Sequence, residues 1–90
     1  MTFYTYVLKC ADESFYTGWT TNLPGRLKAH NSGLGAKYTR ARLPVCLIAC
    51  WEFASKAEAM SWEWHIKQLT RQQKLRLIQE KQSPAADQIN

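Results

Sequence analysis

Residues 3–20, FYTYVLKCADESFYTGWT, decide the fold of this chain. The segments 3–10 and 15–20 are rich in aromatic and β-branched side chains, which favour β-strands. The polar residues 11–14 between them predict a turn. We therefore expect a β-hairpin near the start of the chain.

Tyrosines recur at even intervals in this hairpin, at Tyr4, Tyr6 and Tyr16. If the numbers of paired residues add to an even sum, Tyr6 and Tyr16 share one face of the sheet, whereas an odd sum separates them. Cross-strand packing of aromatic rings is the simplest explanation of such side chains. Gly18 predicts a bulge or a place where another backbone comes close.

A short helix and a third strand follow the hairpin. Asn22 is a good N-cap for a helix that begins at Leu23, and Gly33 is a natural stop. In the basic connection after Gly33, the sequence AKYTRAR favours a short helical turn. Residues 45–53, VCLIACWEF, predict a well-buried strand.

Capping boxes at Ser55–Glu58 and Thr70–Gln73 predict two further helices, over 56–68 and 71–81. The order β-β-α-(turn)-β-α-α predicts an α+β domain, in which a small three-stranded antiparallel sheet is flanked by helices. We expect a single domain over residues 1–82 and a flexible tail over 83–90.

Composition excludes several classes of protein. Ninety residues fit one domain, and the longest apolar run, 45–51, is far shorter than the roughly 17 residues that a membrane helix needs. Three cysteines without a CxxC pair favour a reducing cytoplasm over a disulfide scaffold. Cys46 and Cys50 are expected on one face of a strand. There they are more readily explained as buried thiols than as zinc ligands with His30 or His65.

The charge is basic and unevenly distributed. Twelve Lys and Arg against seven Asp and Glu give a net charge of +5, and no acidic residue lies between Ser14 and Trp51. That stretch contains Arg26, Lys28, Lys37, Arg40 and Arg42, and a second basic group comprises Lys67, Arg71, Lys74, Arg76 and Lys81. Such clusters favour a nucleic-acid partner, because they can neutralise successive phosphates, over a solvated face without a partner.

Candidate polar residues lie at the borders of apolar helix stripes. In the first helix His30 projects close to Leu23 and Leu27, with Arg26 beside them. In the helix over 56–68, Glu63 borders a stripe made of Ala59, Trp62, Ile66 and Leu69. Taken singly, side chains at such borders more often cover apolar surface than perform chemistry.

Taken in order, these residues resemble a known family. Tyr4-Thr5-Tyr6 followed by Tyr16-Thr17-Gly18 resembles the GIY-YIG nuclease motif, and RLKAH at 26–30 and the later Glu63 follow in the family's order. The stretches FYTGWTTNL, HNSGLGAKYTR and IKQLTRQQKLRLI look like the small stand-alone bacterial members. The resemblance covers about residues 3–80.

The resemblance implies both the fold above and a site. It assigns Tyr6 and Tyr16 to the motif tyrosines, Gly18 to the motif glycine, Arg26 to the helix arginine, His30 to a position often His or Tyr, and Glu63 to the metal-binding carboxylate. Family enzymes hydrolyse phosphodiesters with one divalent cation, usually Mg²⁺ or Mn²⁺. This chain departs from the motif at Tyr4 and Thr5, and it has Trp19 where some members have lysine.

The residue types suit that chemistry. Glu63 offers the oxygen ligand that Mg²⁺ prefers, and the Arg26 guanidinium matches a phosphate. A tyrosine base, Tyr6 or Tyr16, needs nearby cations because its ordinary pKa is about 10, and His30 is a candidate proton relay. Contacts with the nucleic-acid backbone are expected from the basic side chains of Lys28, Lys37, Arg40, Arg42 and Lys67.

The leading hypothesis is therefore a metal-dependent endonuclease that acts on DNA. It should have little intrinsic sequence specificity, since 90 residues leave no room for a recognition domain, and a protein partner for targeting is an option. The alternatives are a non-catalytic nucleic-acid-binding module with the same fold and an adaptor that recruits a partner through Trp19, Trp62 or Trp64.

Overall fold

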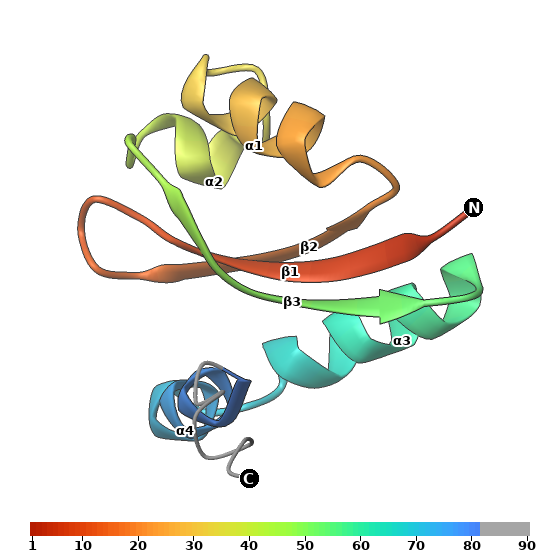
Figure 1. Cartoon of the computed structure of the whole chain (residues 1–90). Coiled ribbons are helices and arrows are strands. Elements are labelled where there is room, and N and C mark those ends of the chain that lie inside the picture. The colour runs from red at the N-terminus through yellow and green to blue at the C-terminus, as the bar shows by residue number, and fades with distance from the viewer. Residues whose placement is uncertain (82–90) are drawn as a thin grey trace, which may run out of the picture.

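The computed structural model describes residues 1–81. Its elements, in chain order, are β1 (Phe3–Lys9), β2 (Phe15–Thr20), α1 (Leu23–Asn31), α2 (Lys37–Arg40), β3 (Cys46–Phe53), α3 (Lys56–Lys67) and α4 (Arg71–Lys81) (Figure 1). This order confirms the predicted α+β class. The expected tail, 83–90, and the proposed domain end at residue 82 lie outside the described residues.

The three strands form one antiparallel sheet in the order β2-β1-β3. Helices α1 and α2 cover one face of the sheet, and α3 and α4 cover the other (Figure 1). Alternate residues of the central strand therefore enter two cores. One core contains Tyr6, Leu8, Cys10 and Val45, and the other contains Val7, Ala49, Ile66 and Ile78.

Local signals begin and end α1 where the sequence predicted. The Asn22 side chain accepts a hydrogen bond from the Gly25 amide at 3.1 Å, which satisfies one of the free N–H groups of the first turn. Beyond the last turn, Gly33 has φ of 84°, a left-handed conformation that glycine adopts without strain. The segment after it forms α2, as expected from AKYTRAR.

Caps also begin α3 and α4. Ser55 Oγ accepts from the Glu58 amide at 3.2 Å and donates to the Glu58 carboxylate at 3.1 Å. Thr70 and Gln73 make the full reciprocal box, with distances of 3.1 and 2.9 Å. Both predicted helices are confirmed, and α3 ends at Lys67, one residue earlier than predicted.

The prediction that the third strand is well buried was wrong. β3 lies at an edge of the sheet, and Cys46 and Leu47 are exposed. An irregularity in the pairing between Val7 and Leu8 shifts the register of β3 by one residue. Cys46 thus pairs with Lys9 and Cys50 with Tyr6, so the two thiols lie on opposite faces and not on one face.

The cysteines of the described chain are all free thiols. Across residues 1–81, no three His, Cys, Asp or Glu side chains gather in a way that could hold a metal ion, so the alternative of a zinc site gains no support. None of the helices in this range is long and apolar enough to cross a membrane.

One side chain ties α1 to the sheet. Asn31, the last residue of α1, donates to the Val45 carbonyl at 3.0 Å and accepts from the Val45 amide at 2.8 Å. The side-chain amide of Asn31 thus bonds both backbone groups of Val45, as a residue on a neighbouring strand would. It fixes the end of α1, which carries His30, relative to the start of β3.

Candidate active site

The two motif tyrosines lie on the same face of the sheet. Tyr6 pairs with Gly18 and Leu8 pairs with Tyr16, so the numbers of paired residues add to 24. Because this sum is even, Tyr6 and Tyr16 point to the same face. The ring centroids of Tyr6 and Tyr16 are 6.5 Å apart. Tyr6 is 1% exposed, whereas Tyr16 is half-buried.

Gly18 makes room for Tyr6 on the edge strand. A Cβ at residue 18 would lie 2.6 Å from Tyr6 Oη and 2.8 Å from Cζ. The sequence predicted a bulge or the approach of another backbone at this glycine. The β1–β2 pairing has no bulge, and the group that approaches is the Tyr6 side chain. Without the glycine, the hydroxyl could not lie over β2.

The Tyr6 hydroxyl forms a hydrogen bond with His30 of α1. This histidine of α1 is 1% exposed, and its Nε2 lies 3.0 Å from Tyr6 Oη. Its Nδ1 lies 2.8 Å from Thr39 Oγ1, and that hydroxyl donates to the Ala36 carbonyl at 3.0 Å. Nδ1 therefore faces two groups, the Thr39 hydroxyl at 2.8 Å and the Ala36 amide at 3.5 Å. We assign the tautomer with Nδ1–H, which uses the shorter contact, so that Nδ1–H donates to Thr39 and Nε2 accepts from Tyr6.

The protonation states agree with this arrangement. Burial, followed by the neighbouring charge of Arg26, lowers the pKa of His30 below 6.5 and keeps the ring neutral at pH 7. Burial, followed by Tyr16, raises the pKa of Tyr6 to about 12, although Arg26 opposes the increase. Tyr6 therefore holds its proton at pH 7 and donates it to a neutral histidine.

Glu63 reaches the same edge from the opposite face of the sheet. It lies on α3, which packs against β1 and β2, and its negative charge contributes to the raised pKa of Tyr6. The Glu63 side chain is 19% exposed and accepts an ion pair from Lys67 Nζ at 3.0 Å. Lys67 in turn lines a hollow together with Tyr16. The carboxylate thus lies at the β2 edge.

Arg26 lies beside Tyr16 at a different hollow from the one that Lys67 lines. The two line a hollow of about 440 Å³ with Ala29, Leu34, Gly35 and Ala36. The five residues expected to be catalytic, Tyr6, Tyr16, Arg26, His30 and Glu63, are therefore gathered at one edge of the sheet. Of these groups, Tyr16 and Arg26 line the hollow, whereas Tyr6 and His30 are buried behind it.

Two residues of this site were not identified from the sequence. Thr39 is fully buried and fixes the His30 ring, and a Cβ on Gly35 would collide with Nδ1 of that ring. Both lie within HNSGLGAKYTR, which the resemblance included, but neither was given a function. Their role becomes visible only in the structure, where this segment folds back over α1 and brings both residues against His30.

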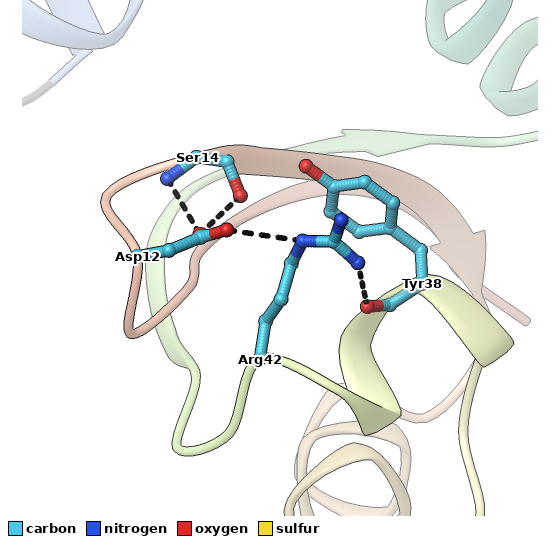
Figure 2. A network of polar contacts seen from close by, with 4 residues as sticks. All are labelled: Asp12, Ser14, Tyr38 and Arg42. Atoms are coloured by element: carbon cyan, nitrogen blue, oxygen red, sulfur yellow. Dashed lines mark hydrogen bonds and ion pairs between the residues drawn. The ribbon is translucent and has the colours of Figure 1, made fainter.

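The basic residues expected to contact nucleic acid divide into two groups. Lys28, Lys37 and Arg40 are exposed. Lys67 is paired with Glu63, and Arg42 donates to Asp12 Oδ2 at 3.0 Å and to the Tyr38 carbonyl at 2.8 Å (Figure 2). Arg42 is thus already engaged within the protein.

A divalent cation fits the donors at this edge. Within residues 1–81, Glu63 is the one carboxylate whose charge acts on Tyr6. It is ion-paired with Lys67 at 3.0 Å, a contact that a bound cation would replace. A single carboxylate suits Mg²⁺, which keeps several waters and takes phosphate oxygens as further ligands.

Comparison with known proteins gives the family. A family model described as the GIY-YIG catalytic domain matches residues 2–76. The chain belongs to the GIY-YIG family. It is 62% identical to the UPF0213 protein CPE1444 of Clostridium perfringens over 78 residues, which are 87% of this chain and 84% of that protein. The resemblance to small stand-alone bacterial GIY-YIG proteins is confirmed.

Solved structures have the same fold. The solution structure of the UPF0213 protein BH0048 from Bacillus halodurans is 51% identical, with a TM-score of 0.62, and the match covers 93% of this chain and 89% of that one. The protein EF2693 from E. faecalis is 45% identical, with a TM-score of 0.58 over 86% and 83% of the two chains.

Proposed function

We propose that this GIY-YIG protein is a divalent-metal-dependent endonuclease that hydrolyses phosphodiester bonds in DNA. The observation that supports it is the gathering of Tyr6, Arg26, His30 and Glu63 from both faces of the sheet at the β2 edge. Of the five groups there, four come from outside β2, and packing alone gives no reason for a carboxylate and a guanidinium to approach the same tyrosine.

The proposed chemistry starts with a proton transfer through Tyr6. Its oxygen accepts a proton from the attacking water while its own proton passes to His30 Nε2, so no free phenolate has to form first. Thr39 accepts the hydrogen bond from Nδ1–H and keeps His30 in the tautomer that can receive that proton.

Arg26 and Glu63 act on the phosphate. The guanidinium of Arg26 offers paired donors to the phosphate oxygens and stabilises the charge that develops on them. Glu63 would hold the divalent cation, Mg²⁺ or Mn²⁺, which polarises the scissile phosphate when bound. Tyr16, beside Tyr6 and Arg26, is proposed to orient the strand.

The proposed substrate is DNA, recognised mainly through its backbone. Lys28, Lys37 and Arg40 are exposed and carry charge that phosphates can neutralise. We also propose a cytoplasmic location, which the three free thiols support, and a separate protein partner for choosing targets.

The experiment compares cleavage by Arg26→Ala, Tyr6→Phe and Arg76→Ala with the unmodified protein, on labelled DNA with Mn²⁺. We expect the first two to cut about 10²–10³-fold more slowly, while DNA affinity falls much less. Arg76→Ala, an exposed arginine of α4, should cut normally. DNA binding without cleavage by the unmodified protein would instead favour the non-catalytic module.

A further inference from the structure

Tyr16 separates the hollow that contains Arg26 from a second hollow. The second has a volume of about 220 Å³ and is lined by Phe15, Tyr16, Thr17, Tyr38, Lys67 and Lys74. It shares Tyr16 with the first hollow, and Lys67 is the ion-pair partner of Glu63, so the second hollow adjoins the candidate active site.

The lining of this second hollow combines aromatic rings with ammonium groups. Tyr38 stacks with Tyr16 at 6.1 Å between centroids and 24° between planes, and 38% of Tyr38 is exposed. Lys74 adds positive charge, and Lys67, which also lines the hollow, is ion-paired with Glu63 at 3.0 Å. Flat rings bind nucleobases by stacking, and ammonium groups bind phosphate, so the pair of features suits a nucleotide.

The size of the hollow favours one unit of a polymer. Pockets that enclose a whole small-molecule ligand are typically about 300–1,000 Å³. A shallower hollow of about 220 Å³ can hold one nucleotide whose neighbours lie outside it, in particular in the larger hollow on the other side of Tyr16.

Tyr38 is held in place before any ligand arrives. The Arg42 guanidinium lies 3.9 Å from the centroid of the Tyr38 ring and donates to the Tyr38 carbonyl (Figure 2). Arg42 is in turn held by Asp12, whose other carboxylate oxygen accepts from Ser14 in the β1–β2 turn. The ring is thus ordered, with Arg42 over it and Tyr16 stacked beside it, so a base would contact the part of Tyr38 that remains exposed, and little entropy would be lost.

We propose that this second hollow is a subsite for the nucleotide next to the scissile phosphate. Its base or sugar lies against Tyr38, and its phosphate lies between Lys67 and Lys74. The subsite rests on the proposed nuclease function for its biological use, but the binding that it predicts can be measured without cleavage.

The test is a titration of the nitrogen-15-labelled protein, in the absence of metal, with thymidine 5′-monophosphate and separately with inorganic phosphate. We expect the nucleotide to shift the amide signals of Thr17, Tyr38 and Lys74, with weak binding on the order of millimolar. Tyr38→Ala should weaken nucleotide binding at least about fivefold and leave phosphate binding unchanged, because stacking is lost.

Matched variants make the result decisive. Tyr38→Phe keeps the ring and should keep the nucleotide affinity, which separates stacking from any general loss of structure. Lys74→Gln should weaken both ligands, whereas Lys81→Gln, on the same helix but outside the hollow, should weaken neither. Nucleotide-induced shifts elsewhere, or equal affinities for Tyr38→Ala and Tyr38→Phe, would overturn the subsite.

Cleavage measurements distinguish this inference from the proposed function. Tyr38→Ala should raise KM for DNA, whereas Tyr38→Phe, which keeps the ring, should leave it unchanged. If the nucleotide binds as expected but DNA is never cut, the subsite stands and the nuclease proposal fails. If DNA is cut and Tyr38→Ala changes neither KM nor nucleotide binding, the subsite fails and the nuclease proposal stands.

Discussion

Gly18 connects the sequence motif to the position of the Tyr6 hydroxyl. Any side chain at residue 18 would occupy the space in which Tyr6 Oη meets His30, because a Cβ would lie 2.6 Å from that oxygen. The motif glycine therefore serves the tyrosine on the neighbouring strand, and its backbone needs no unusual φ.

Gly18→Ala should consequently lower the free energy of unfolding by about 1–3 kcal/mol, the usual cost of overpacking a core. Adding Tyr6→Phe removes the nearest contact and should recover part of the loss, while the 2.8 Å contact with Cζ remains. Urea unfolding of the two single variants and the double variant measures this coupling.

Gly33→Ala provides the control. A Cβ there meets no atom within 4 Å, and the cost comes from the left-handed φ of 84°. This loss should add to that of Tyr6→Phe without coupling. Equal coupling at both glycines, or none at Gly18, would contradict the contact with Tyr6.

His30 gives the site a defined pH dependence. Its pKa is lowered in the folded protein, so the unfolded chain takes up a proton first as pH falls through about 6.5. The contribution of neutral His30 to the free energy of unfolding is therefore fully present above pH 6.5. It is lost as the pH falls toward the pKa of His30 in the folded protein.

We expect the free energy of unfolding in urea to decrease between pH 7 and pH 5, and the His30 ring signals in a carbon-13 NMR titration to have a midpoint below 6.5. Cleavage should fall over the same range, because a protonated ring cannot accept the Tyr6 proton. A His30 midpoint at or above 6.5 would show that the ring is not buried in the way described.

At the scale of elements, the boundaries were predictable because short-range chemistry sets them. Asn22 and Gly33 define α1, and the boxes at Ser55 and Thr70 begin α3 and α4. The burial of β3 was not predictable. An apolar run such as VCLIACWEF looks the same in a central strand and in a bulged edge strand, and only the pairing order β2-β1-β3 distinguishes them.

Thr70→Ala should test the capping box of α4. It removes the acceptor for the Gln73 amide, and we expect the free energy of unfolding to fall by about 0.5–2 kcal/mol. Thr21→Ala, an exposed threonine before α1, should change it by less than about 0.5 kcal/mol. Thermal or urea unfolding measures both, and equal effects would show that the box does not stabilise α4.

For the whole molecule, the site was only partly predictable. The sequence placed Tyr6 and Tyr16 on one face only on condition that the register sum was even. The approach of Glu63 to them depends on α3 crossing the far face of the sheet, which no local pattern reveals. The family order of the residues supplied what periodicity did not. The internal use of Arg42 could not be predicted, because its partners Asp12 and Tyr38 depend on how the β1–β2 turn meets α2.

The net charge of +5 predicts salt-sensitive binding. For duplex DNA, the logarithm of affinity should fall with that of salt concentration by about 0.9 for each phosphate contact. Replacing exposed Lys37 by Gln should reduce this slope by about 1, and Lys56→Gln, an exposed lysine outside both basic groups, should leave it unchanged. Fluorescence anisotropy with Glu63→Gln, which should bind without cutting, measures the slope. A slope near zero would show that the protein does not recognise DNA through its phosphate backbone.

The most direct measurement is the rate of DNA cleavage by the protein with Glu63→Gln and with Glu52→Gln, each in Mg²⁺, in Mn²⁺ and with EDTA. Glu52 is an exposed carboxylate on β3 and provides the matched control. We predict that the unmodified protein and Glu52→Gln cut DNA only with the divalent cation, and that Glu63→Gln cuts at least about 10²-fold more slowly while still binding DNA. Cleavage that persists in EDTA, or that is equal in the two variants, would contradict an active site at the β2 edge.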